Sequence, residues 1–214
     1  MTRIAIFGGS FDPVHRGHLE IIRAIDKQVR PDRFLLIPCG TPPHRDSLVA
    51  NSEQRLCMLE LACRELRESG IKIEIDRREI DREGPSYSYL TLEQLRRENP
   101  EALLLLAMGW DSLVGFATWR CWQKILEISC ISVVSRAGDK RVIPAEIGVE
   151  TESLADTELA AGKIIQLEFD EIALSSTEVR RLLKDRRIEE IPLKDAPLSP
   201  GVYEYIQQQR IYLG

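Results

Sequence analysis

The sequence predicts an α/β fold of the Rossmann-like, doubly wound kind, with a mostly parallel sheet and helices on both faces. Three observations predict it. Short β-type runs alternate with amphipathic helical patterns, as right-handed βαβ crossovers require. The run Ala102–Met108 is apolar throughout, which is typical of a strand buried inside a parallel sheet. Glycines, histidines and other polar residues follow the expected strands, where open parallel sheets bind their ligands.

The elements follow one another in a regular order. The first run, Thr2–Phe7, is expected to be a strand. The next segment, Leu19–Val29, is expected to be a helix because its apolar residues recur every three or four positions. Four further strands are expected at Arg33–Pro38, Ile71–Asp76, Ile131–Ser135 and Lys163–Phe169, and helices at Ser52–Ser69, Tyr89–Arg97, Thr118–Ile128, Thr177–Lys184 and Gly201–Gln209.

Length and composition predict one domain over residues 1–214, with a short C-terminal helical part from about residue 175. The polar stretch Ala137–Gly162 is weakly patterned and is expected to form a surface excursion. The net charge of −5 argues against broad binding of nucleic acid, which needs a basic face.

Targeting signals and cysteine usage predict a cytoplasmic protein. No apolar run approaches about 20 residues, so no membrane span is expected. The N-terminus MTRIAIFGG does not resemble a signal peptide. The five cysteines form neither a CxxC pair nor a zinc-ligand spacing, which favours free thiols in a reducing compartment.

The segment GGSFDPVHRGH follows the first strand and holds two of the three histidines of the chain. Gly8 and Gly9 allow a phosphate to approach the backbone, and the next helix points its N-terminal N–H groups at the same space. His15 and His18 can then donate hydrogen bonds to charge on phosphoryl oxygens. An incidental capping role would explain one such histidine better than it explains a His-x-Gly-His pair.

Other loops also carry candidate residues. His44 lies in the rigid turn PCGTPPHR, which can equally be a plain surface turn. Ser86 and Ser88 lie in GPSYSYLTL, where one of them is expected to cap the following helix and the other to face a ligand. Asp111 follows a buried strand, where it can accept hydrogen bonds from ribose. Trp119 can stack on a planar ring, whereas Trp110 and Trp122 are expected in the core.

The late segment LSSTEVRRLL predicts a second helix N-terminus. Ser175 and Glu178 have the spacing of a capping box. Capping alone gives no role to Ser176 or Arg180, and a hydroxyl and a guanidinium there suit a triphosphate.

The His-x-Gly-His segment resembles the signature of the nucleotidyltransferase superfamily. With PPHR, EQRLCMLELA, SYSYLTL, MGWDSL, TWRCW, LSSTEVR and VYEYIQQQRIYL, the chain resembles the bacterial nicotinate mononucleotide adenylyltransferases over nearly its whole length. Four positions depart from the pattern of that family. Ser10 and Ser88 stand where threonine is frequent, Arg120 where an aromatic residue or histidine is common, and Trp110 where the residue is usually small.

The resemblance implies transfer of AMP from ATP to nicotinate mononucleotide, which yields nicotinate adenine dinucleotide and pyrophosphate in NAD biosynthesis. Mg²⁺ is expected to arrive with ATP, without a metal site on the protein. The nicotinate ring is expected against Trp119 and its carboxylate near Ser88 and the N–H of Arg120. The residues expected to act are: for catalysis, His15, His18 and Arg180; for ATP, Gly8, Gly9, Ser10, Phe11, His18, Gly109, Ser175, Ser176 and Arg180; for the second substrate, His44, Ser88, Asp111, Trp119 and Arg120.

Other functions compete with this interpretation. A sister transferase of the same fold would act on nicotinamide mononucleotide or pantetheine phosphate. A non-catalytic nucleotide-binding module would keep the fold without the reaction. An RNA-binding module is disfavoured by the acidic charge balance. The sequence leaves open whether the chain forms a homo-oligomer.

Overall fold

The structure is a computed structural model, and it describes residues 1–43, 48–135, 143–149, 151–154, 158–168, 174–185, 187–191 and 195–213. The described strands form one seven-stranded sheet in the order β3-β2-β1-β4-β5-β7-β6, and every neighbouring pair is parallel. The strands are β1 (Arg3–Gly9), β2 (Arg33–Pro38), β3 (Ile73–Ile75), β4 (Leu103–Gly109), β5 (Cys130–Ser135), β6 (Thr151–Ser153) and β7 (Ile164–Glu168).

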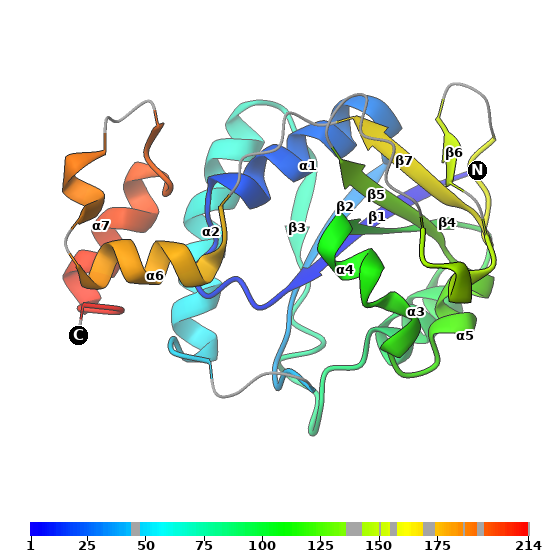
Figure 1. The fold of residues 1–214 in the computed structure, drawn as a ribbon, viewed down its shortest axis with the longest axis horizontal. Coiled ribbons are helices and arrows are strands. Elements are labelled where there is room, and N and C mark those ends of the chain that lie inside the picture. The colour runs from blue at the N-terminus through cyan, green and yellow to red at the C-terminus, as the bar shows by residue number, and fades with distance from the viewer. Residues whose placement is uncertain are drawn as a thin grey trace.

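The helices connect these strands and cover the sheet on both sides (Figure 1). They are α1 (Arg16–Val29), α2 (Ser52–Glu68), α3 (Ser88–Glu98), α4 (Trp110–Val114), α5 (Trp122–Ile128), α6 (Ser176–Lys184) and α7 (Pro200–Gln209). The described residues also form short 3₁₀ turns at η1 (Phe116–Thr118), η2 (Ala145–Ile147) and η3 (Arg187–Glu190).

Alternation along the buried strands divides the core in two. In β1, Ala5 and Phe7 pack with α1, α2, α6 and α7, whereas Ile4 and Ile6 pack with α3 and α5 on the opposite face. Successive side chains of a strand point to opposite faces, so a strand that is apolar throughout needs helices on both. The predicted Rossmann-like, doubly wound architecture is confirmed.

The direction of winding reverses between β1 and β4. The chain first adds β2 and β3 on one side of β1, and β4 then pairs with its other side. The carboxyl ends of β1 and β4 therefore diverge into loops that lead to opposite faces of the sheet. Such a point is where open α/β sheets bind ligands.

Two parts of the fold differ from the prediction. The region expected to be one helix, Thr118–Ile128, begins its helix α5 only at Trp122, because Cys121 adopts a left-handed φ of 56°. The short helix α4 and turn η1 precede it and were not predicted. Strand β6 was also not predicted, because three polar residues at the edge of a sheet give no recognisable alternation.

The C-terminal helices lie together at one end of the molecule (Figure 1). Helix α7 packs against α2, and Val179 and Leu183 of α6 join the same core as α1 and α2. Within the described residues, no helix has the length and apolar character that crossing a membrane requires.

Candidate active site

A cavity of about 440 Å³ opens at the carboxyl ends of β1 and β4. Its volume is in the range of sites that hold a small organic ligand. Nine of the residues singled out in the sequence line it, and they come from the end of β1 and the first loop after it, the end of β4, α4, the start of α3 and the turn before it, and the segment after η1: Gly8, Gly9, Ser10, Ser86, Ser88, Gly109, Asp111, Trp119 and Arg120. Segments far apart in the sequence therefore meet at the switch point of the sheet.

The two histidines of the first loop lie against each other at the start of α1. His15 is the N-cap residue of this helix, and its backbone N–H donates a 3.2 Å hydrogen bond to Nδ1 of His18. The ring centroids are 3.8 Å apart, with 34° between the ring planes. Neither ring is part of the cavity lining. The two histidines therefore lie beside the N-terminus of α1, next to Gly8 and Gly9, which do line the cavity.

His15 is neutral at physiological pH. Its side chain is buried, and this burial lowers its pKa to about 4. Among the described residues, none hydrogen-bonds to its buried Nδ1 atom. Buried polar atoms without a partner are uncommon in folded proteins and call for an explanation. A neutral imidazole can still donate one hydrogen bond to a phosphoryl oxygen, and it does so without the cost of a buried charge.

Phe11 does not line the cavity, and its buried side chain supports the first loop from within the core. Its ring is fully buried and packs edge-on against Phe7 and His18, with centroid distances of 5.7 and 5.1 Å. The Phe11 ring also lies beside Gly9, where an added Cβ would come within 3.2 Å of it. The first loop is thereby held by an aromatic side chain packed beneath it.

Helix α6, which lies near the C-terminal end of the sequence, contacts the first loop. Oγ of Ser175 accepts a hydrogen bond from the N–H of Glu178, so this serine caps the helix as its spacing predicts. Oγ of Ser176 donates to the carbonyl of Pro13 at 3.1 Å. Arg180 donates from Nη1 to the carbonyl of Asp12 at 2.6 Å. Ser176 and Arg180, for which capping gave no role, therefore bind the loop that carries the histidines.

Two buried charged residues that the sequence analysis missed support the same loop. The carboxylate of Asp12 accepts hydrogen bonds from the N–H groups of Val49 and Ala50 at 2.8 and 3.0 Å. The guanidinium of Arg55 is fully buried and donates to the carbonyl of Ser10 at 2.9 Å. The only signal for Asp12 in the sequence is the Asp-Pro dipeptide, which also suits an ordinary turn.

The start of α3 corrects one sequence-based expectation. Neither Ser86 nor Ser88 caps this helix, because Tyr87 is the N-cap residue and makes no capping hydrogen bond with its side chain. Ser86 instead accepts a hydrogen bond from the N–H of Gly40 at 2.8 Å. Ser88 is the first residue of α3 and lines the cavity. The chain thus exposes the Ser88 hydroxyl to a ligand without a competing capping role.

The aromatic wall of the cavity lies around η1. Trp119 is half-buried, lines the cavity and contacts Phe116 edge to face at 5.6 Å. Trp110 is buried, as expected of a core residue, while Trp122 is only half-buried against the same Phe116. The guanidinium of Arg120 lies 4.9 Å from the centre of the Tyr87 ring. This contact joins the segment after η1 to the start of α3, and both segments border the cavity.

Two of the remaining candidate residues lie at the start of α4. Gly109 is the N-cap residue of α4, and an added Cβ there would meet nothing within 4 Å. Asp111 is exposed in the first turn of α4 and lines the cavity. His44 lies outside the described residues. In the part of the chain that the structure describes, no three His, Cys, Asp or Glu side chains gather as a metal site would require.

Comparison with known proteins identifies the family. The cytidylyltransferase-like family model matches residues 6–182. The chain belongs to this family. It is also 36% identical to a probable nicotinate-nucleotide adenylyltransferase of Methylococcus capsulatus, over 98% of this chain and 99% of that relative. A relative of the same name from Chromobacterium violaceum is 34% identical over 99% of each chain. The chain is therefore a nucleotidyltransferase of the nicotinate-nucleotide adenylyltransferase family.

Solved structures agree on the fold of this family member. A nicotinic acid mononucleotide adenylyltransferase of Plasmodium falciparum, complexed with NaAD, superposes with a TM-score of 0.75 at 17% identity, over 99% of this chain and 98% of that one. A nicotinate-nucleotide adenylyltransferase structure from Vibrio parahaemolyticus gives a TM-score of 0.65 at 18% identity, over 100% and 96%.

Proposed function

We propose that the chain transfers AMP from ATP to nicotinate mononucleotide, giving nicotinate adenine dinucleotide and pyrophosphate. One observation carries the proposal beyond the names of the relatives. The glycine loop of β1 and the aromatic segment around Trp119 line one 440 Å³ cavity, so that a phosphate site and a ring site adjoin. A transferase that joins two mononucleotides needs this adjacency.

ATP is assigned to the side of the cavity formed by the first loop. Backbone N–H groups near Gly8, Gly9 and Ser10, together with the N-terminus of α1, suit its phosphates. Ser175, Ser176 and Arg180 are assigned to the pyrophosphate end, because their helix begins against the same loop. Gly109 leaves open space at the end of β4, where a nucleotide can approach the backbone.

The second substrate is assigned to the opposite side. Its nicotinate ring would stack on Trp119, and its ring carboxylate would accept hydrogen bonds from the Ser88 hydroxyl and the N–H of Arg120. Asp111 is exposed at the rim, where it can accept hydrogen bonds from ribose hydroxyls. Uncharged donors and a nearby cation favour a carboxylate over a carboxamide, so the acid form of the substrate is expected to be preferred.

The chemistry needs little beyond positioning and charge stabilisation. A phosphate oxygen of nicotinate mononucleotide attacks the α-phosphorus of ATP in line. The new P–O bond forms as the bond to the bridging oxygen of the β-phosphate breaks, and pyrophosphate leaves with that electron pair. The attacking oxygen is already anionic, so no general base is required. His15 and His18 would donate hydrogen bonds to the phosphoryl oxygens.

Mg²⁺ is treated as part of the substrate, Mg-ATP. With no carboxylate cluster among the described residues, phosphate oxygens and water would supply most of its ligands. A cytoplasmic location is also proposed, and the five free cysteines support a reducing compartment.

The test is pyrophosphate release from Mg-ATP with nicotinate mononucleotide and, in parallel, with nicotinamide mononucleotide and with pantetheine phosphate. We expect release with the acid, weaker release with the amide, and loss of both in His18→Ala. Release with the amide alone, or with pantetheine phosphate alone, would instead identify a sister transferase. If ATP binds but no acceptor causes release of pyrophosphate from it, the protein is a non-catalytic module.

A further inference from the structure

The loop between β3 and α3 holds a buried carboxylate at the wall of the cavity. The side chain of Glu79 is only 7% exposed and contributes to the lining of the cavity. It stands in the charged run DRREIDREG, whose other residues are exposed or only half-buried. Burial raises the pKa of this carboxyl group, while hydrogen bonds from Thr91 and Ser86 act in the opposite direction. A buried carboxylate in a ligand cavity is costly unless its hydrogen bonds serve a purpose.

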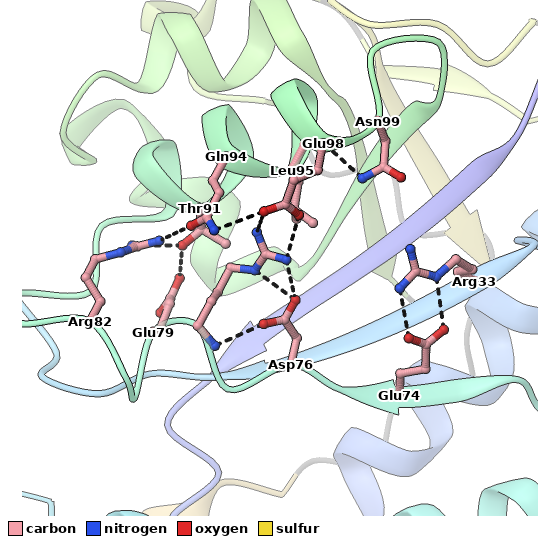
Figure 2. Close-up of polar contacts among 11 residues, drawn as sticks. Arg33, Glu74, Asp76, Glu79, Arg82, Thr91, Gln94, Leu95, Glu98 and Asn99 are labelled. Atoms are coloured by element: carbon pink, nitrogen blue, oxygen red, sulfur yellow. Dashed lines mark hydrogen bonds and ion pairs between the residues drawn. The ribbon is translucent and has the colours of Figure 1, made fainter.

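Two hydroxyl groups interact with the carboxylate of Glu79. Thr91 Oγ1 donates to its Oε1 at 2.6 Å, and the Ser86 hydroxyl also interacts with the carboxylate and lowers its pKa. Figure 2 shows Glu79 and Thr91 facing each other, with Arg82 beside them. Each hydroxyl carries a single proton. Thr91 already accepts from Arg82 at 3.2 Å, and Ser86 already accepts from Gly40 N–H at 2.8 Å. The proton of each hydroxyl is therefore available to Glu79, whose carboxylate can only accept.

This arrangement joins three segments around the end of the cavity that is assigned to the nicotinate ring. Thr91 belongs to α3, Ser86 to the loop that leads into α3, and Gly40 to the loop that follows β2. The backbone N–H of Ser86 also donates to the carbonyl of Thr41 at 2.8 Å. The two loops are packed so closely that a Cβ at Gly40 would lie 2.3 Å from the carbonyl oxygen of Glu79. Ser86 is followed directly by Tyr87 and Ser88, both of which line the cavity.

We propose that Glu79 is a positioning residue for the second substrate: through Ser86 and Thr91 its carboxylate fixes the loop that presents Tyr87 and Ser88 to the nicotinate ring. This role rests on the proposed function, because it concerns the part of the same site that would hold the nicotinate ring. Glu79 does not take part in the chemical step. Its loss therefore affects binding of nicotinate mononucleotide more than binding of ATP or turnover.

Glutamine is a weaker partner than this carboxylate. It replaces one of the two acceptor oxygens with an NH₂ donor and removes the negative charge that strengthens hydrogen bonds from the two hydroxyls. We expect Glu79→Gln to raise KM for nicotinate mononucleotide about tenfold, the value of one hydrogen bond to a charged group. The kcat value and KM for ATP are expected to change less than about twofold, because the loops at the phosphate end are held by other residues.

Two further variants separate positioning from charge and from stability. Ser86→Ala removes a donor but leaves the Glu79 charge in place, so it should also raise KM for nicotinate mononucleotide. The double variant should show less than the product of the two single effects, since both act through one contact. Glu74→Gln is the matched control: this carboxylate on β3 accepts hydrogen bonds from Arg33, but it is half-exposed and outside the cavity (Figure 2).

The experiment is steady-state kinetics with each substrate varied in turn, with thermal unfolding of every variant alongside. A rise in KM for nicotinate mononucleotide alone, in Glu79→Gln and Ser86→Ala but not in Glu74→Gln, supports the role. Unchanged KM in folded Glu79→Gln, or equal rises for both substrates, would overturn it. If Glu79→Gln does not fold, Ser86→Ala decides between the same outcomes. A wild-type protein that does not use nicotinate mononucleotide would refute the proposed function itself, and the role of Glu79 with it.

Discussion

The hydroxyl of Tyr212, beyond the last helix, donates a 2.6 Å hydrogen bond to Oδ1 of Asp12 in the first loop. The same carboxylate accepts from two backbone N–H groups at residues 49 and 50, and the carbonyl of Asp12 accepts from Arg180. One buried residue thus connects the first loop to the segment before α2 and to segments near the end of the chain. The shape of the proposed phosphate site consequently depends on residues that follow α7.

Removal of this hydroxyl should destabilise the protein. In Tyr212→Phe the buried carboxylate of Asp12 loses one of the three hydrogen-bond donors that the described residues give it, and we expect the free energy of unfolding to fall by about 1.5–3 kcal/mol. Urea unfolding at pH 7 measures this change in the free energy of unfolding. Tyr205→Phe is the matched control, since Tyr205 is half-buried on α7 and its hydroxyl bonds only to the exposed Cys57 among the described residues. Equal losses in both variants would contradict a special role for Tyr212.

A methyl group at Gly17 should disturb the histidine pair without weakening the helix. Gly17 lies in the first turn of α1, and an added Cβ would lie 3.1 Å from both Cε1 and Nδ1 of His15. The His15 ring must then move by a few tenths of an ångström. We expect kcat of Gly17→Ala to fall roughly tenfold, because small misplacements of catalytic groups are costly.

The control for Gly17→Ala is Gly201→Ala in α7. There the nearest atom to an added Cβ is Cδ2 of Leu61 at 3.7 Å, an ordinary contact. Alanine favours a helix over glycine by about 1 kcal/mol, so Gly201→Ala should raise stability and leave kcat unchanged. A Gly17→Ala protein with wild-type kcat would show that the position of the His15 ring does not limit the reaction.

Much of the fold could be predicted from the sequence because it depends on local periodicity. The continuous apolar run at Leu103–Met108 can be buried on both faces only between helices, and this requirement fixes the layers of the sheet. Parallel strands end at one edge, so the loops after β1 and β4 were expected to meet, and the cavity joins them. Loop residues such as Gly8, Gly109 and Trp119 were found by this reasoning.

The supporting contacts could not be predicted, because they join residues that are distant in sequence. Nothing near Tyr212 indicates that its hydroxyl reaches Asp12, 200 positions away. Glu79 stands among charged residues that usually face solvent, and it is buried where the loop that holds Gly40, distant in sequence, packs against it. The start of α3 was misjudged for a related reason: Ser86 bonds to Gly40 rather than to its own helix.

Burial of His15 should make stability depend on pH. Its pKa is lowered to about 4 in the folded protein from 6.5 in the unfolded chain. Between these values the unfolded chain binds more protons, so the free energy of unfolding decreases as the pH falls from about 6.5 to about 4. Between pH 7 and pH 4.5 this residue should account for roughly 2 kcal/mol of the loss.

The variant His15→Asn isolates that contribution, because asparagine does not titrate. Its loss of stability between the two pH values should be smaller than that of the wild type by the same amount. An NMR titration of the imidazole measures the pKa directly. A ring that titrates near 6.5 would contradict the buried, neutral state.

Arg120 should tune the choice between acid and amide substrates. It is exposed, lines the cavity beside Ser88, and stacks over Tyr87 at 4.9 Å. A positive charge at this place favours a ring carboxylate and does little for a carboxamide. In Arg120→Gln we expect the ratio of kcat/KM for nicotinate and nicotinamide mononucleotides to fall about threefold at low salt, a modest effect because the charge is solvated.

The same measurement at high ionic strength tests the physical cause. Screening shortens the reach of an exposed charge, so the difference between wild type and Arg120→Gln should shrink as salt is added. Arg97→Gln removes another exposed arginine, on α3 and outside the cavity, and should leave the ratio unchanged. If Arg120→Gln lowers kcat/KM equally for both substrates at every salt concentration, Arg120 acts by holding Tyr87 in place, and its charge does not select the substrate.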